Sequence, residues 1–448
     1  MQMIDTIVVG AGIAGITAAR LLQHEGHRVV VLEARDRVGG RMWTDRSAGF
    51  PVDRGASWIH GLVDNPLTSL VEDLGIRTLE FTVGSYQAGG RPITNFDETH
   101  RALDEQRTSA WLDDVETTDR HLTAAIAAAD PGRTYADVAE QAVTACVEDP
   151  TRRTRLREFL RHRTEEQCGA DFTAVDAHGL DEDAIEGDEV VFPDGYDALP
   201  GALSHGLDIR LEEVVDAVEW SPGGVRLTAG RQVHEARRAI VTVPLGVLKS
   251  AAITFTPPLP DEVLGPIERI GMGVFNKVFL RFPERFWSES AYALRQLGPA
   301  GTPWHTWYDV SRVSGEPVLL TFAGGTWGRR IEAMADAEVV ASVLSSLRRM
   351  YGPSVPEPVD HWITRWGQDE FSRGSYSYVA TGASHHDHDA MATPIADVLH
   401  LAGEATWSSD PATVHGALLS GHRAATRVLG RPVDLRALLA PTRPTTRA

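Results

Sequence analysis

Cysteine, lysine and long apolar runs are all scarce in this chain of 448 residues. Its two cysteines, Cys146 and Cys168, provide neither a disulfide framework nor metal-ligand spacing, so we predict no metal site and a reducing, cytoplasmic location. The first apolar run, residues 4–9, is too short for a signal peptide, and no stretch reaches the length of a membrane span. We therefore expect no membrane partner.

Positively charged side chains are also fewer than negatively charged ones. The formal net charge of −19 argues against a general nucleic-acid binder and favours cationic ligands. Only two of the 43 lysine and arginine residues are lysines, Lys249 and Lys277, so each lysine that remains needs a reason. The length exceeds the size at which a single core keeps growing, and we expect two domains. Nothing in these numbers defines the oligomeric state.

The clearest functional pattern lies near the N-terminus. It predicts, in order, a buried parallel strand, a GxGxxG turn, a helix and a second strand that ends on an acid, over residues 4–9, 10–15, up to about 24 and 28–33. Gly10 permits the tight turn, Gly12 lets the backbone approach a pyrophosphate, and Gly15 allows close helix–strand packing. The helix N-terminus then offers free N–H groups to that pyrophosphate. Glu33 is placed to bind an adenosine ribose, which disfavours NADP.

A second glycine turn separates the possible dinucleotides. Arg35 leads toward Gly40 and Arg41, a flexible turn that ends in a guanidinium able to clamp a phosphate with two hydrogen bonds. A nicotinamide enzyme needs no second clamp of this kind, so the pattern favours FAD. Near the other terminus, Gly403 and Glu404 follow a short apolar run and precede a helix that we expect from about Thr413. The N-terminus of that helix would stabilise negative charge on a reduced flavin.

Lys277 lies in an expected strand over residues 273–282. Period-two alternation places it on one face with Phe275 and Phe279, where an ammonium group is poorly placed for idle solvation. We expect it to act as a compact, rotatable donor that holds a water molecule. His60, in a loop over residues 50–66, is a candidate for orienting a substrate nitrogen. The alternative is that it only bonds a nearby carbonyl group.

Two other segments suggest substrate contacts. Residues 361–378 are rich in aromatic side chains that could wall a cavity for an amine and exclude water. Residues 181–189 hold six acids, among them Glu182 and Asp183, which form either a solvated loop or a negative funnel for a polycationic substrate. A helix over residues 151–163 carries six arginines, which we interpret as a solvated face.

Nearly the whole chain resembles the flavin amine oxidases, in particular the branch of polyamine oxidases and lysine-specific histone demethylases. The likeness is carried by GAGIAG, RVGGR, GASWIHG, PDGYDALP, VTVPLGVLK, FNKVFLRF, TRWGQDEFSRGSYSYV and AGEATWSSDPATVHGALLSG. The resemblance implies an α/β fold with a discontinuous, Rossmann-like FAD-binding domain and a second, α+β substrate-binding domain. We expect the first over residues 1–81, 191–265 and 386–430, the second over 82–190 and 266–385, and a loosely packed tail over 431–448.

The resemblance also assigns residues. It implies FAD contacts at Ala14, Glu33, Arg35, Arg41, Ser57, Trp58, Val215, Trp366, Glu404, Thr413 and Val414. Lys277 matches the lysine that holds a water near flavin N5, and His60 matches a substrate-site histidine of animal and fungal polyamine oxidases. Trp366 and Tyr376 match aromatic walls of the active site. Ser375 stands where monoamine oxidases attach flavin through cysteine, so we expect non-covalent FAD.

Two departures bear on the substrate. Thr413 stands where monoamine oxidases and plant polyamine oxidases have the second tyrosine of the substrate cage, and Asp410 replaces an aromatic residue that is common nearby. Both positions are candidate substrate contacts with an open preference. The long helical tower and the extra N-terminal domain of the demethylases have no counterpart in the sequence, so we expect no chromatin role.

The resulting hypothesis is a polyamine oxidase acting on spermine- or spermidine-type amines. Hydride would leave the carbon beside a neutral nitrogen for flavin N5, water would hydrolyse the imine, and O2 would become H2O2. Two alternatives stay open. One is an oxidase of another amine or of an L-amino acid, which would need a guanidinium for the carboxylate. The other is a flavin-stabilised binding protein without turnover.

Overall fold

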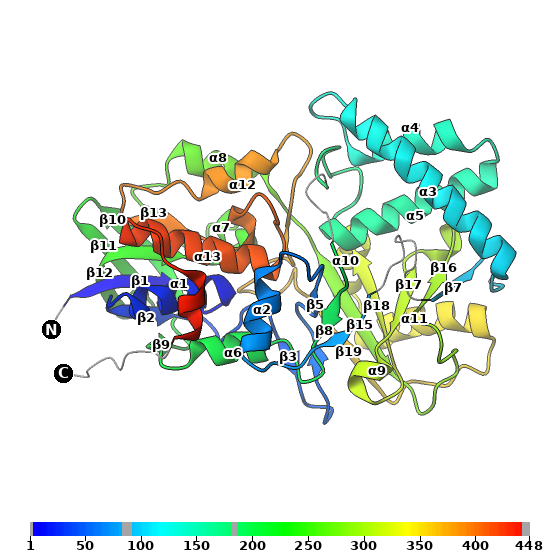
Figure 1. The fold of residues 1–448 in the computed structure, drawn as a ribbon, viewed down its shortest axis with the longest axis horizontal. Coiled ribbons are helices and arrows are strands. Elements are labelled where there is room, and N and C mark those ends of the chain that lie inside the picture. Colours follow the sequence, from blue (N-terminus) through cyan, green and yellow to red (C-terminus); the bar gives the residue numbers. More distant parts are fainter. Residues whose placement is uncertain (1–2, 83–91, 181–185, 441–448) are drawn as a thin grey trace.

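Two lobes, each built on its own large β-sheet, lie side by side in the computed structural model (Figure 1). The structure describes residues 3–82, 92–180 and 186–440. Glu182 and Asp183, the two acids expected to contact substrate, therefore lie outside the described residues. Within the described residues, no helix is both long enough and apolar enough to cross a bilayer.

The sheet of the first lobe is mostly parallel. Its strand order is β13-β10-β11-β12-β1-β2-β9, and β21 pairs with β12 beside this path. The strands are β1 (Ile4–Val9), β2 (Val29–Leu32), β9 (Ile209–Arg210), β10 (Val215–Ser221), β11 (Gly224–Ala229), β12 (Gln232–Val241), β13 (Thr254–Thr256) and β21 (Leu399–Leu401). Strands β10, β11 and β12 form an antiparallel meander, whereas β1 is parallel to both β12 and β2.

Helices cover both faces of this sheet, as the apolar pattern of β1 requires. Val8 packs into a core with α1 (Ile13–His24) and α13 (Val414–Leu429), while its neighbours Ile7 and Val9 pack into a second core on the opposite face. The opposite face is covered by α7 (Leu245–Lys249), α8 (Asp261–Arg269) and α12 (His385–Met391). Burial on both faces explains why residues 7–9 of the strand are continuously apolar rather than alternating.

The second lobe contains a six-stranded sheet in the order β19-β15-β18-β17-β16-β7. Its strands are β7 (Ile93–Phe96), β15 (Phe275–Arg281), β16 (Ala293–Gln296), β17 (Thr306–Asp309), β18 (Val318–Gly324) and β19 (Asp360–Ile363). All neighbours are antiparallel except β7 and β16. One face packs against α11 (Asp336–Tyr351). In the chain, α9 (Ser311–Ser314) precedes β18, and α10 (Gly325–Glu332) lies between β18 and α11.

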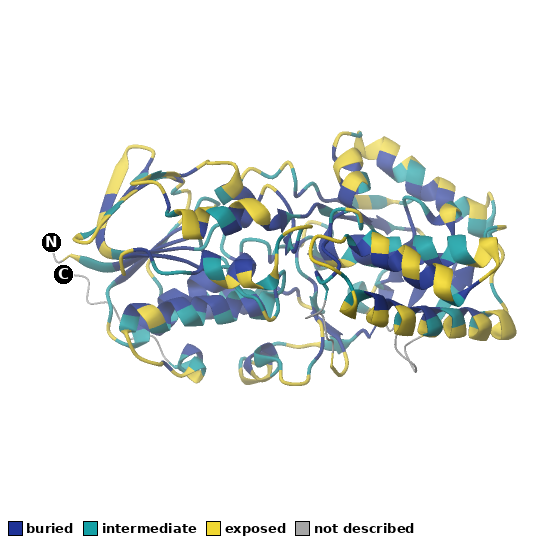
Figure 2. Ribbon diagram, turned by 90° about the horizontal axis from the view of Figure 1, so that it is seen from above, coloured by how far each residue is buried: buried dark blue, intermediate teal, exposed yellow. Residues whose placement is uncertain are grey.

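Three helices complete the second lobe: α3 (Glu105–Ala127), α4 (Tyr135–Cys146) and α5 (Pro150–Cys168). Leu156, Phe159 and Leu160 of α5 are buried. The outward faces of these helices carry the exposed residues, and the interiors of both lobes are buried (Figure 2).

Small elements complete the fold. They are the pair β3 (Thr44–Asp45) and β4 (Val52–Asp53), the trio β5 (Trp58–Ile59), β6 (Leu79–Glu80) and β8 (Val190–Val191), and the pair β14 (Gly271–Met272) and β20 (Ser377–Tyr378). With them come α2 (Pro66–Asp73), α6 (Ala198–Ser204), and the single turns η1 (Pro299–Gly301), η2 (Glu404–Thr406) and η3 (Leu435–Leu439).

One local expectation is wrong, and the exact borders of the two domains stay a prediction. The tail is not loose up to residue 440, because Leu438 is fully buried and Arg20 of α1 donates to the carbonyl groups of Leu438 and Ala440.

Candidate active site

The glycine turn after β1 forms one end of a large cavity. Gly10 has a φ of +101°, which a side chain would strain, and Gly12 caps α1 without a side-chain bond. A Cβ added to Gly12 would meet no atom within 4 Å, because this residue faces open cavity space beside Ala14. A Cβ on Gly15 would lie 2.0 Å from the Gly10 carbonyl oxygen, so Gly15 serves close packing and does not line the cavity.

Glu33 follows β2 and is buried at the cavity edge. Its Oε2 accepts the N–H of Ala11 at 2.6 Å, and its Oε1 accepts the N–H of Arg35 at 3.0 Å. Two backbone donors thus hold the carboxylate in place beside the glycine turn, where a ribose hydroxyl group of a dinucleotide would need an acceptor.

Arg41 joins the two ends of the sequence. Its Nη1 donates to Glu404 Oε1 at 2.8 Å and to the carbonyl oxygen of Ser375 at 2.9 Å. Although burial raises the pKa of Glu404, Arg41 and the hydroxyl group of Ser377 together hold that pKa below its usual value. Arg41 and Glu404 both line the cavity, as do Gly40, Val215, Gly403 and Val414.

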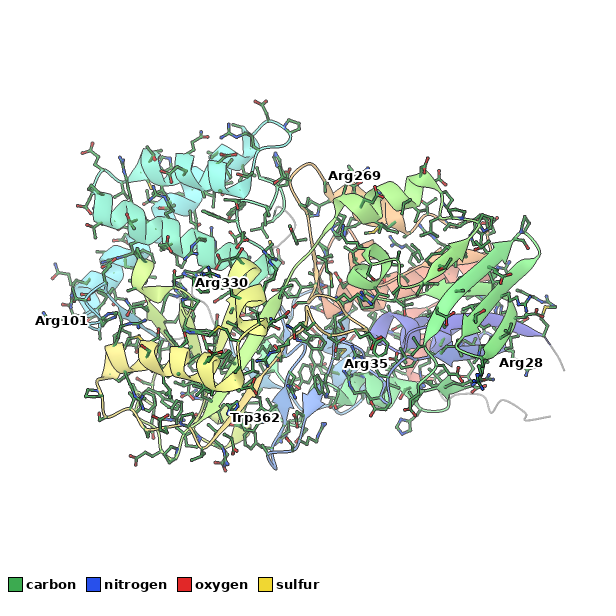
Figure 3. The ribbon with its side chains drawn as sticks, turned by 180° about the vertical axis from the view of Figure 1, so that it is seen from behind. Arg28, Arg35, Arg101, Arg269, Arg330 and Trp362 are labelled. Carbon is green, nitrogen blue, oxygen red and sulfur yellow. The ribbon has the colours of Figure 1, made fainter. Side chains whose placement is uncertain are left out.

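The guanidinium of Arg35 has a protein partner that the sequence did not suggest. It donates to the two carboxylate oxygens of Asp369 at 3.1 and 2.5 Å and to Ser372 Oγ at 3.1 Å. Asp369 lies in the loop between β19 and β20, so this pair connects the two lobes where they meet (Figure 3). Arg35 lines the cavity, but its guanidinium is held in the ion pair with Asp369 that connects the lobes.

Lys277, in the middle of β15, is buried at the cavity wall. Its Nζ donates to the carbonyl oxygens of Gly55 at 2.6 Å and Asp53 at 3.1 Å, and to Ser57 Oγ. The ammonium lies 5.4 Å from the ring centre of Trp58, within the range of a cation–π contact.

Lys277 and Asp53 also influence each other's ionisation. Burial lowers the pKa of Lys277 to about 8, and the nearby Asp53 carboxylate partly opposes that shift. Burial raises the pKa of Asp53 itself to about 6, against hydrogen bonds from Thr44 and Tyr196.

His60 has a carboxylate partner rather than the carbonyl partner of the plainer interpretation. Its Nδ1 bonds Glu189 Oε1, and its ring stacks on Trp58 with the planes 15° apart. Glu189 and Glu186, two of the three described acids of the 181–189 segment, both line the cavity that His60 also lines. An Nδ1–H that points to Glu189 leaves Nε2 as an acceptor.

Aromatic residues form the opposite wall. The indole of Trp366 donates to the carbonyl oxygen of Arg54 at 3.2 Å, and the hydroxyl of Tyr376 donates to the carbonyl oxygen of Glu166 at 2.6 Å. Phe275 and Phe322 stack with ring centres 4.7 Å apart, and the ring centre of Phe275 lies 5.8 Å from that of Tyr376. These contacts fix the rings, so the wall is shaped before any ligand binds.

Glu166 is a cavity residue that the sequence interpretation missed. It lies on α5, is partly buried at the cavity, and accepts the hydroxyl of Tyr308 at 3.2 Å. Burial raises its pKa to about 7, against the pull of Arg295. A signal was available, because Glu166 is seven residues after the inward-facing Phe159 and therefore shares its helix face.

Asp410 and Thr413 lie where α13 begins. Thr413 Oγ1 accepts the N–H of Gly416 at 2.9 Å as the N-cap, and Asp410 Oδ1 pairs with His415 Nε2 at 3.2 Å. Both candidate substrate contacts line the same cavity as Lys277, His60, Trp366 and Tyr376.

The cavity measures about 1480 Å³ and runs from the glycine turn to the helices of the second lobe. Most small-molecule sites measure about 300–1,000 Å³, so there is room for a dinucleotide and a substrate together. The open space at Gly12, the uncapped start of α1 and the buried Glu33 all fit an FAD. Among the described residues, no group of histidine, cysteine and acidic side chains could hold a metal ion.

Comparisons with known proteins agree with this geometry. The sequence model of the family described as flavin containing amine oxidoreductase matches residues 13–429. Polyamine oxidase 2 of Arabidopsis thaliana is 34% identical over 438 residues, which cover 94% of this chain and 87% of that protein. Lysine-specific histone demethylase 2 of Homo sapiens is 31% identical over 440 residues. Those residues cover 95% of this chain but only 53% of the demethylase, so the chain spans about half of that relative's length.

Solved structures show the same fold. The cyclohexylamine oxidase of Brevibacterium oxydans IH-35A superposes with a TM-score of 0.77 at 23% identity, over 96% of this chain and 99% of that one. A double mutant of putrescine oxidase superposes with a TM-score of 0.76 at 24% identity, over 95% and 99% of the two chains. At these identities the likeness supports the fold alone.

Proposed function

The chain belongs to the flavin-containing amine oxidoreductases, which are FAD enzymes, and from this premise we propose that it is a polyamine oxidase. The observation that carries the proposal is the lining of the part of the cavity away from the glycine turn and Glu33. Acidic side chains from three segments, Glu166, Glu189 and Asp410, line it together with fixed aromatic rings. Such a lining suits a long substrate with several positive charges.

Several residues of the cavity wall have defined roles in this proposal. Trp366 and Tyr376 confine the amine and exclude water around the reacting carbon. His60, oriented by Glu189, accepts a hydrogen bond from the substrate nitrogen through Nε2. Lys277 supplies positive charge from the buried wall beside the proposed site of O2 reduction. Its three ammonium donors are taken by Asp53, Gly55 and Ser57, so it does not hold the water molecule that the sequence predicts.

The overall reaction balances without further reactants. One amine, one O2 and one H2O give a carbonyl compound, a shorter amine and H2O2. The two electrons lost by the substrate carbon reach O2. FAD, when bound, supplies the intermediate acceptor for those electrons. Cys146 and Cys168 do not line the cavity, and Ser375 Oγ is engaged with the Phe275 backbone at 2.8 and 2.9 Å, so the cofactor is held without a covalent bond.

A peroxide-coupled assay of the purified holoenzyme over spermine, spermidine, putrescine, aromatic monoamines and L-amino acids tests the proposal. We expect the highest kcat/KM with spermine or spermidine. Preference for monoamines or L-amino acids would replace polyamine oxidation by one of those activities. Absence of flavin reduction with every compound would instead favour a binding protein without turnover.

A further inference from the structure

Asp410 and His415 form a carboxylate–imidazole pair on the cavity wall. Asp410 is in the loop before α13 and His415 is in its first turn, and Oδ1 of the one lies 3.2 Å from Nε2 of the other. The His415 side chain is 14% exposed and the Asp410 side chain 38% exposed. Whether this pair carries a net charge depends on where the imidazole holds its protons.

The hydrogen bonds that the Asn65 side chain makes to the backbone show where the imidazole holds its protons. Its Oδ1 accepts the N–H of Leu67 at 3.0 Å as the N-cap of α2, and its Nδ2 donates to the carbonyl oxygen of Gly61 at 3.1 Å. One partner can only donate and the other can only accept, so the amide has one orientation. Its Nδ2 also lies 3.4 Å from His415 Nδ1.

The orientation of this amide determines the tautomer of His415. Because Asn65 presents an N–H group to Nδ1, Nδ1 must be the acceptor and carries no proton. The ring proton is therefore on Nε2, where it is donated to Asp410. A neutral imidazole hydrogen-bonds the carboxylate without cancelling its charge, so the pair keeps one full negative charge on the cavity wall.

We propose that Asp410 determines substrate specificity by binding the ammonium group of a di- or polyamine that is remote from the oxidised carbon, with neutral His415 holding the carboxylate in place. This inference rests on the proposed function and adds the group that selects the substrate. The pair is close to the reacting region, because Asn65 connects it to Gly61, the neighbour of His60. A monoamine leaves Asp410 without a cationic partner.

Calorimetric titration of the anaerobically pre-reduced holoenzyme tests the inference, since reduced enzyme binds amines but cannot oxidise them. The probes are spermidine and its two analogues that each lack one terminal amine, N-butylpropane-1,3-diamine and N-propylbutane-1,4-diamine. In D410N we expect spermidine to bind about tenfold more weakly, the loss that removal of one charge-assisted hydrogen bond produces. The analogue that lacks the amine facing Asp410 should change by less than about twofold, whereas the other analogue should follow spermidine.

Two further variants make the outcome decisive. H415Q keeps an uncharged donor for Asp410, so we expect its affinity for spermidine to stay close to that of the parent. Severalfold tighter binding by H415Q would show that the imidazole was cationic. Glu357, an exposed carboxylate beyond α11 that pairs with Arg348, supplies the control E357Q, which should leave all affinities unchanged.

Other results overturn the inference as well. They are an equal effect of D410N on spermidine and both analogues, no effect on any of them, or no spermidine binding by the parent. None of these measurements requires turnover. A chain that binds spermidine through Asp410 but never oxidises it would therefore overturn the proposed function and leave this inference standing.

Discussion

At the scale of single residues, the two lysines make similar bonds for different purposes. Lys249 donates to three carbonyl oxygens at the end of α8, those of Ile267, Glu268 and Ile270, at 2.8–2.9 Å. Its task is to cap a helix C-terminus. Lys277 makes the same number of bonds inside the cavity wall, where we propose that its charge assists the reduction of O2.

Replacement of Lys277 by methionine should therefore slow the reaction of reduced enzyme with O2, by about 10²–10³-fold, because a buried charge that stabilises reduced oxygen is lost. Stopped-flow mixing of pre-reduced K277M with O2 measures this rate. Binding of FAD should weaken much less. K249M is the matched control: we expect a loss of about 1–2 kcal/mol in unfolding free energy and an unchanged rate. Normal reoxidation of K277M would refute the assigned role.

The ionisation of Lys277 predicts a pH dependence. Because burial lowers its pKa to about 8, the ammonium form is present below that pH and is lost above it. Reoxidation should therefore slow as pH rises through about 8. Asp53 favours the charged form of Lys277, so D53N should move the midpoint of this profile to lower pH. Rates of reoxidation between pH 6 and 10 for both proteins check the direction, and a midpoint that moves upward would contradict it.

At the scale of elements, helices α1 and α13 cross with their backbones in close contact. Gly421 of α13 packs on the backbone of α1, and a Cβ there would lie 2.1 Å from the carbonyl oxygen of Ala14. Both helices begin at the cavity, through Gly12 and Thr413. Their separation therefore sets the width of the expected FAD cradle.

We expect G421A to force these helices apart, with a loss of about 1–3 kcal/mol in unfolding free energy and weaker FAD binding. Thermal unfolding and ultrafiltration with FAD measure the two effects. The control is G201A in α6, where an added Cβ meets nothing within 4 Å. That change should stabilise the protein by about 0.4–1 kcal/mol and leave FAD affinity unchanged. Equal behaviour of the two variants would disprove the packing role.

Elements of this kind could be predicted because each depends on residues that are close in sequence. The apolar run of β1, the spacing of the three glycines that follow it and the start of α13 after Thr413 are all local patterns. Strand β15 also alternates as expected, because Val278 and Leu280 pack into one core and Phe279 into another. The packing of the C-terminal residues could not be predicted from the sequence. The apolar residues of η3 pack on α1, which comes more than 400 positions earlier.

At the scale of the whole molecule, the missed features are pairings between distant residues. Glu189 meets His60 across 129 positions, Glu166 meets Tyr308 across 142, and Arg35 meets Asp369 across 334. No periodicity encodes such pairs, because each one forms only where segments far apart in the sequence come together in the fold. The sequence had suggested a solvated loop or a negative funnel for the segment that contains Glu189 and a cofactor contact for Arg35, and it had not singled out Glu166. Only the fold shows which partner each one has.

The longest of these pairings predicts how the lobes cooperate. The Arg35–Asp369 pair fixes the loop that carries Trp366 and Tyr376 to the first lobe, and its side chains are 15% and 23% exposed. In D369N we expect faster amide hydrogen exchange over residues 364–376 and a severalfold higher KM for the amine at saturating FAD. Because the pair is partly exposed, unfolding free energy should fall by only about 0.5–1 kcal/mol.

A matched control separates this coupling from simple loss of an ion pair. Glu98 binds Arg155 with two hydrogen bonds of 2.8 and 2.6 Å, at 29% and 19% exposure, but both residues belong to the second lobe. E98Q should therefore lose similar stability while KM and exchange over residues 364–376 stay as in the parent. If E98Q and D369N raised KM equally, general destabilisation would explain both. If only D369N raises KM, the ion pair between Arg35 and Asp369 positions the aromatic wall for the substrate.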